Sequence, residues 1–217
     1  MDQPQLVAPS HGQVVDEAKT AAPSRDAADL AKSAEREKWR ASLREANQHV
    51  WLHGPHGSGD NLDASLKRNS AFIKRLKQTN LADAKDALVK EVQLLSLTKY
   101  LDELIPSIPE ILWKATTLKD RYAAIEILCA LHARFGGSEF TEPLLKVMEQ
   151  EIVPPPPKSQ DASNEQAQKE AALVARQRSL LRGVTEMVLV GLVGPMTLSE
   201  GCLLYTSPSP RDQRGSR

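Results

Sequence analysis

The chain has 217 residues, and its 28 lysine and arginine side chains balance 28 aspartate and glutamate side chains. Because the net charge is zero, nucleic-acid binding cannot be argued from overall electrostatics and would need a local patch. Aromatic residues make up only 4% of a chain in which Leu and Ala are abundant, a profile that predicts an all-helical fold. The length suffices for one domain of ordinary size with flexible ends.

The cysteines and the N-terminus argue against a secreted or membrane protein. Cys129 and Cys202 are the two cysteines, and Cys129 lies within an apolar helical pattern, so we expect no disulfide framework and a reducing compartment. The N-terminus lacks the cationic start and apolar stretch of a signal peptide. The most apolar window, residues 184–193, is too short to span a bilayer and contains Glu186. These features predict a soluble intracellular protein.

The first quarter of the chain divides into three segments. Residues 1–26 are rich in Gln, Pro, Ser, Ala and Asp, which predicts a disordered tail because so little apolar surface cannot offset the entropy of ordering. Residues 27–52 predict a long charged helix that is mostly solvated. Its few large apolar anchors are Leu30, Trp39, Leu43 and Trp51. Glycines and a proline make residues 53–61 a Gly-rich loop.

Residues 62–153 carry successive amphipathic patterns that predict a helical repeat domain. The first, residues 62–77 (LDASLKRNSAFIKRLK), separates an apolar arc from a cationic arc when wound at about 3.6 residues per turn. The apolar arc comprises Leu62, Leu66, Phe72, Ile73 and Leu76, together with Asn69. The next helix is predicted over residues 82–95.

Two prolines interrupt the helical pattern that follows. Residues 97–115 have apolar side chains at helical spacing, but Pro106 and Pro109 lie inside the pattern. Each proline removes a backbone donor and costs about 3 kcal/mol in a helix interior. We therefore expect a kink or a split between residues 104 and 109.

The pattern over residues 118–135 is apolar on nearly all sides, which predicts a central helix packed between neighbours. Its most enclosed positions, Ile125 and Leu128, are expected to be almost fully buried. Gly136 and Gly137 predict the end of this helix. A further helix is expected to open at residue 138 or 141, and its inward-facing residues are Leu144, Leu145, Val147 and Met148.

The C-terminal third is irregular at both of its ends. Four prolines begin a Pro-rich polar linker over residues 154–166, which is more typical of a spacer than of a ligand for SH3 or WW domains. The final helices of the fragment are expected over residues 167–198, with a core helix at 180–193. Residues 199–217 predict an irregular tail of foreign origin, which would leave the helical array incomplete at its C-terminal end. The side chains then expected to be partly exposed are Val188, Leu189 and Leu192.

Patterns typical of catalysis are weak. Residues 54–59 are glycine-rich but lack the Gly-Lys-Ser/Thr ending of a phosphate-binding loop. His53 and His56 have no cysteine or carboxylate cluster nearby to complete a metal site. Cys129 and His132 are one helical turn apart, but in so apolar a helix they are better explained as core and boundary residues than as a nucleophile and its base. We predict no catalytic residue, no cofactor and no metal.

Several of these segments, in order, resemble one family. They are residues 43–47 with Trp51, then 62–77, 95–115, 123–135 and 180–193. Together they are similar to the first middle domain of the regulator of nonsense transcripts two family, the scaffold of the up-frameshift complex in nonsense-mediated mRNA decay. The resemblance extends over residues 38–198, about three quarters of the chain. The sequence shows no repeat of fixed period, so it is the resemblance that implies a HEAT-like solenoid of the initiation factor 4G middle-domain type.

The resemblance implies a non-enzymatic scaffold in nonsense-mediated mRNA decay. Its expected partners are other decay proteins, among them an RNA helicase and a junction-bound factor that bind mainly through regions outside this chain, and also RNA. The expected location is the cytoplasm, with the perinuclear region and the nucleus as alternatives. Two other functions stay open: a middle domain of a translation-initiation cap-complex scaffold, and a generic helical-repeat adaptor in transport or trafficking.

The cationic arc of residues 62–77 is the candidate contact site. Its side chains are Lys67, Arg68, Lys74, Arg75 and Lys77, and a weaker contribution is expected from Arg36, Lys38, Arg40 and Arg44. Such a surface would bind RNA phosphates or an acidic partner, with a steep dependence on salt and little sequence preference. The alternative is a solvated face on an ordinary packed helix.

Overall fold

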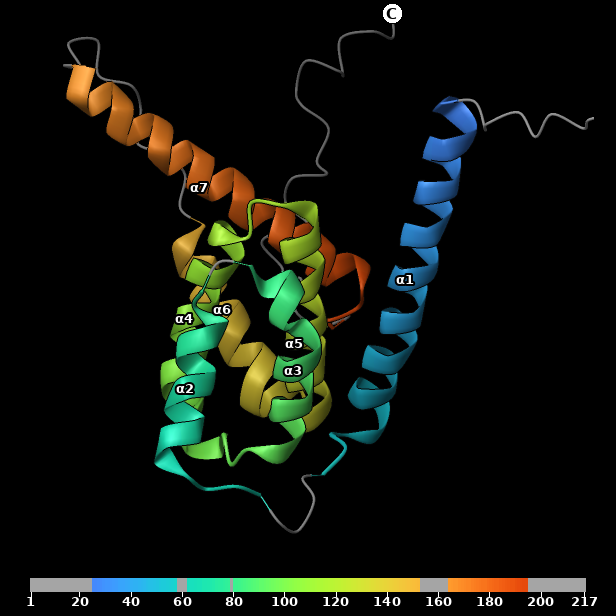
Figure 1. Cartoon of the computed structure of the whole chain (residues 1–217), viewed down its shortest axis with the longest axis vertical. Helices are drawn as coiled ribbons and strands as arrows, with labels where there is room; N and C mark the ends of the chain where they lie inside the picture. The colour runs from blue at the N-terminus through green and yellow to red at the C-terminus, as the bar shows by residue number, and fades with distance from the viewer. Residues whose placement is uncertain (1–24, 58–61, 79, 153–163, 195–217) are drawn as a thin grey trace, which may run out of the picture. The chain divides into compact units, whose positions relative to one another are not determined.

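The computed structural model describes residues 25–57, 62–78, 80–152 and 164–194, and over these ranges the fold is all-α, as the sequence predicts (Figure 1). The helices are α1 (Arg25–His53), α2 (Leu66–Leu76), α3 (Leu81–Leu94), the 3-10 turn η1 (Thr98–Tyr100), α4 (Leu101–Lys114), α5 (Leu118–Gly136), the π-helical turn η2 (Gly137–Thr141), α6 (Glu142–Glu151) and α7 (Asn164–Leu189). The chain forms two units, Met1–Glu37 and Lys38–Arg217, whose boundary falls within α1.

The described part of the first unit is the beginning of α1. Lys32 forms an exposed pair with Asp29 at 3.5 Å. Leu30 is 71% exposed, so its expected role as an apolar anchor is wrong. This stretch has no other large apolar side chain, which agrees with a mostly solvated helix.

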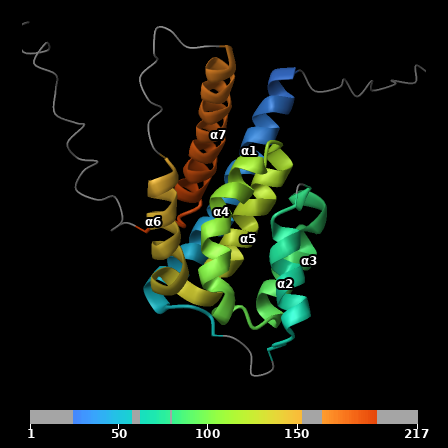
Figure 2. The same ribbon diagram turned by 90° about the vertical axis from the view of Figure 1, so that its left-hand side faces the viewer.

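The core of the second unit is organised around α5. This helix contacts α3, α4 and α7, and α4 in turn contacts α6 and α7 (Figures 1 and 2). Ile125 is fully buried and Leu128 is 4% exposed, which confirms the prediction for both. Contact with neighbours on several sides explains why the apolar pattern of α5 runs around most of its circumference.

Helix α4 continues through both of its prolines. Pro106 and Pro109 lie inside the helix Leu101–Lys114, so the predicted split is wrong. Burial on this helix offsets the lost hydrogen bonds, because residues on both sides of each proline belong to the core. Between the prolines, the Ser107 hydroxyl donates a hydrogen bond to the Leu104 carbonyl at 2.7 Å.

Glycine ends α5 as predicted. Gly136 has φ +78, a left-handed conformation that side chains disfavour. The chain then makes the turn η2 and enters α6, whose first turn contains Pro143. Leu144 and Met148 are buried, whereas Leu145 and Val147 are only partly buried.

The C-terminal end of α7 differs from the expected core helix. The helix ends at Leu189, and the chain then turns through Gly191, which has φ +70. Val188 is 50% exposed and Leu189 is partly exposed, as expected, but Leu192 is fully buried, so that prediction is wrong. Leu192 is buried because the turn after the helix folds its side chain back into the core cluster.

Several predicted segments lie outside the described residues. These are the tail 199–217, most of the tail 1–26 and of the linker 154–166, and part of the loop 53–61. The segment boundaries drawn from the sequence therefore stay predictions. Among the described helices, none is both long and apolar enough to cross a membrane.

Candidate functional site

The cationic helix α2 is held in place by its apolar arc and by the segment before it. Phe72, Ile73 and Leu76 are buried in the core. The sequence also predicts Leu66 on the apolar arc, but it is 68% exposed, so that prediction is wrong. Asn69 is also buried, and its Nδ2 donates to the Ser65 carbonyl at 2.9 Å. Four of the six residues of the predicted apolar arc therefore fix the orientation of this helix.

The segment before α2 is tied to the end of α3. The Asp63 amide donates to the Leu94 carbonyl, and the Ser96 amide donates to the Asp63 carbonyl, both at 2.9 Å. The Asp63 side chain accepts a hydrogen bond from the Ser65 amide at 2.8 Å. This bond and the neighbouring Arg68 lower the pKa of Asp63. Asp63 lies before the first residue of α2, Leu66.

Three of the five predicted site cations pair with acids of the same chain. Arg68 pairs with Asp63, and Arg75 pairs with Glu91 of α3. The Nζ atom of Lys77 lies 3.7 Å from a carboxylate oxygen of Glu103 in α4. The positive charge of these side chains is partly neutralised within the domain.

Lys67 and Lys74 form the remainder of the cationic surface. Both are exposed, and neither pairs with an acid within the part of the chain that the structure describes. The face available to an anionic partner is therefore smaller than the sequence pattern suggests. It is closer to a solvated helix face with two free cations.

Of the described α1 cations that the sequence predicts to contribute weakly to the contact site, two form contacts within the fold. The Arg40 guanidinium makes two hydrogen bonds of 2.9 and 2.7 Å to Glu186, and both side chains are largely buried, at 16% and 12% exposure. Arg44 donates to the Leu189 carbonyl at 2.9 Å. Both arginines thus join α1 to the end of α7. Arg36 is partly exposed and Lys38 is exposed.

Asn47 is a structural residue that sequence reasoning missed. Its side chain is buried, and its Nδ2 donates to the Val190 carbonyl at 2.8 Å and to Cys129 Sγ at 3.3 Å. One amide therefore links α1, α5 and the turn after α7. The signal available in the sequence was a polar residue four positions after Leu43, on the apolar stripe of α1.

Cys129 and His132 are enclosed in the core. Burial raises the pKa of the Cys129 thiol to about 12, which keeps it protonated at neutral pH. Burial also lowers the pKa of His132, whose Nδ1 lies 2.7 Å from Thr141 Oγ1 and whose ring packs against Trp51. Both features favour a packing role over nucleophilic catalysis.

The predicted histidines His53 and His56 are joined by a third. The ring of His49 lies 4.3 Å from that of His53 and 5.5 Å from that of His56, measured between centroids. Within the described residues, no group of three histidine, cysteine or acidic side chains is arranged to hold a metal ion. The cluster is therefore an aromatic contact at the end of α1.

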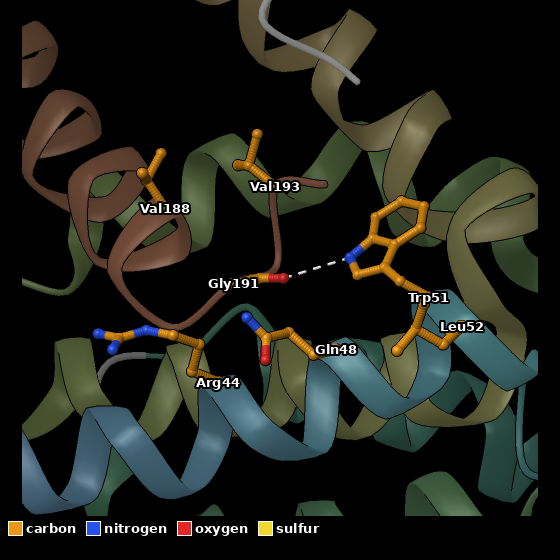
Figure 3. A pocket seen from close by; sticks show the side chains of 7 residues that line it. All are labelled: Arg44, Gln48, Trp51, Leu52, Val188, Gly191 and Val193. Carbon is orange, nitrogen blue, oxygen red and sulfur yellow. Dashed lines mark hydrogen bonds between the residues drawn. The ribbon is translucent and has the colours of Figure 1, made fainter. Parts of the chain in front are cut away.

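A groove lies between α1 and the turn after α7 (Figure 3). Its volume is about 440 Å³, and its walls include Trp51, Leu52 and Val188. Trp51 Nε1 donates to the Gly191 carbonyl at 3.2 Å across one end. Leu52 is 79% exposed, so the groove has an open apolar rim. No sequence pattern pointed to this feature, because its two walls are about 140 residues apart.

Comparison with known proteins shows which proteins the chain resembles. No protein-family model matches the chain. Nonsense-mediated mRNA decay protein 2 of Saccharomyces cerevisiae is 39% identical over 132 residues, 60% of this chain and 12% of that protein. Regulator of nonsense transcripts 2 of Homo sapiens is 30% identical over 161 residues, 73% of this chain and 11% of that protein. The chain thus spans about an eighth of the length of these relatives.

A solved structure supports the same relationship. The N-terminal mIF4G domain of S. cerevisiae Upf2, described as a protein involved in the degradation of mRNAs containing premature stop codons, superposes with a TM-score of 0.59 at 32% identity. The match covers 72% of this chain and 48% of the chain in that structure. The chain is therefore similar to the Upf2 proteins over 60–73% of its length, and its helical part shares the fold of the N-terminal mIF4G domain of S. cerevisiae Upf2.

Proposed function

We propose that this chain contributes a non-enzymatic helical scaffold to nonsense-mediated mRNA decay. The observation that carries the proposal is the similarity, in both sequence and fold, to the N-terminal mIF4G domain of Upf2. The burial of Cys129 and His132 supports a scaffold over an enzyme. Its proposed partners are proteins of the decay complex. The decay names of the relatives favour this role over a cap-complex scaffold or a trafficking adaptor.

A domain exchange tests the role. The segment 38–194 would replace the matching part of nonsense-mediated mRNA decay protein 2 in S. cerevisiae, and the level of a reporter mRNA with a premature stop codon would be measured. We expect the exchange to restore decay of the reporter. The control is an exchange with an unrelated helical domain of similar length. A chimera that is expressed at the normal level but leaves the reporter stable would contradict the proposal.

A finer proposal concerns α2, whose exposed cations would contact RNA phosphates or an acidic partner. Lys67 and Lys74 carry this proposal, because Arg68, Arg75 and Lys77 already have acidic neighbours. For single-stranded RNA, two phosphate contacts predict a slope of log affinity against log salt of about −1.4, whereas five predict about −3.5.

Fluorescence anisotropy at several salt concentrations distinguishes these cases. We expect α2 to make the smaller contribution, so that the double variant Lys67→Glu/Lys74→Glu reduces the magnitude of the slope by about 1.4. Unchanged binding after all five cations are converted to Glu would end the proposal. Absence of binding at low salt would favour a solvated helix face.

A further inference from the structure

A second cluster of cations lies in a cleft between α7 and the junction of α4 with α5. The cleft has a volume of about 380 Å³, at the lower end of the roughly 300–1,000 Å³ typical of ligand sites. The side chains with polar or aromatic groups that line it are Trp113, Thr116, Arg121, Arg176, Ser179 and Arg182. Three arginines and a tryptophan therefore line one concave site.

Arg121 is the least expected of these side chains. It is 9% exposed, and its Nε has no hydrogen-bond partner within the described residues. Its only contact with an acceptor there is a long one, 3.5 Å from Nη2 to the Ala115 carbonyl. A buried cation without a counter-ion is costly, and such groups are normally paired. The unpaired guanidinium therefore points to an anionic ligand.

The other two arginines leave the cleft with an excess of positive charge. Arg176 pairs with Glu151, yet its Nε is also buried without a partner within the described chain. Arg182 is exposed and pairs with no acid in that part of the chain. The nearby Glu110 is already neutralised by Lys114, at 2.6 Å. Among the described residues, no carboxylate forms an ion pair with Arg121 or Arg182.

The indole of Trp113 indicates which class of anion fits. Two cations lie near this ring, with Arg176 Cζ at 5.9 Å and Lys114 Nζ at 6.0 Å from its centroid. A phosphorylated peptide would need the arginines but not an aromatic platform. Single-stranded RNA uses both, because its phosphates bind guanidinium groups and its bases stack on aromatic side chains.

We propose that this cleft binds a nucleotide of single-stranded RNA, with the phosphate held by Arg121 and Arg182 and the base stacked on Trp113. Arg176 adds positive charge, and the Thr116 hydroxyl lines the same site. The recognition requires no particular base, since every base has a π face. No residue of α2 lines the cleft, and the proposal needs no assumption about mRNA decay.

The test is fluorescence anisotropy of the full chain with a labelled short oligouridine. We expect Arg182→Glu and Arg121→Gln each to weaken binding about tenfold or more, the loss expected for one charged hydrogen bond. The matched control is Lys90→Glu, an exposed cation on α3 with no acidic partner among the described residues, which should change affinity less than about twofold. Arg182 is exposed, so its replacement should not disturb folding. If a thermal melt shows that Arg121→Gln does not fold, the site is tested with Arg182→Glu alone.

A second comparison separates stacking from charge. Trp113→Leu should weaken binding of oligouridine but leave binding of an abasic oligomer of equal length unchanged. Three results would overturn the site: equal losses in Arg182→Glu and Lys90→Glu, no effect of Trp113→Leu on oligouridine, or no binding of oligouridine at low salt. Arginine-dependent binding of a phosphoserine peptide in place of oligouridine would also overturn it.

Discussion

The central position of α5 predicts a large loss of stability on replacing Leu128 with alanine. Leu128 is 4% exposed and lies in the middle of the helix that contacts α3, α4 and α7. Truncation removes buried methyl groups and leaves a cavity, which costs about 2–5 kcal/mol. For a domain of this size each kcal/mol lowers the melting temperature by about 2–4 °C, so we expect a fall of about 4–20 °C.

The same substitution at Leu118 provides the control, because this residue lies on the same helix but is 49% exposed. With half the burial, Leu118→Ala should cost about 1 kcal/mol. The exposed Lys74→Ala should stay within about 0.5 kcal/mol. The measurement is a set of thermal melts by circular dichroism. Equal melting temperatures for the Leu128 and Leu118 variants would refute the placement of α5 at the centre of the core.

Three further substitutions or reactions probe the interior. Gly137→Ala should cost about 1–3 kcal/mol in urea unfolding, because an added Cβ would lie 2.1 Å from the Trp51 ring, whereas Gly57→Ala meets nothing within 4 Å and should be neutral. Burial lowers the pKa of His132 below 6.5, so protonation of this side chain should reduce the free energy of unfolding as the pH falls below 6.5. In urea titrations at pH 7.5 and 5.5, His132→Gln should make the free energy of unfolding less dependent on pH. Cys129 should resist maleimide until the chain unfolds, as peptide mapping would show.

The helices and the centre of the core were predictable because their signals are local. Periodicity places Phe72 and Ile73 on one arc of a helix whatever the neighbouring helices are. The all-round apolar pattern of 118–135 likewise indicates a helix enclosed by others. Pro106 shows the limit of local reasoning, since its helical penalty is outweighed by burial that only the tertiary structure provides.

The cation pairs were not predictable, because they depend on which helices meet. Glu91 follows Arg75 by 16 positions, on a different helix, and no spacing rule connects them. The bond from Arg40 to Glu186 spans 146 positions. The prediction for Leu66 is wrong for a related reason: among the described helices, none covers that end of α2, and the side chain is 68% exposed.

The same reasoning changes which cations matter. A cationic arc read from sequence counts charges, whereas binding an anion requires cations that have no counter-ion in the folded chain. By that criterion three of the five candidate cations of α2 are excluded, because they pair with Asp63, Glu91 and Glu103. In the sequence, Arg121 lies within an apolar helical pattern and belongs to no cationic cluster. In the fold it is buried without an acidic partner among the described residues, which makes it the stronger candidate for binding an anion. Unpaired charge, which only the tertiary structure reveals, is therefore a better guide to an anion site here than charge density along one helix.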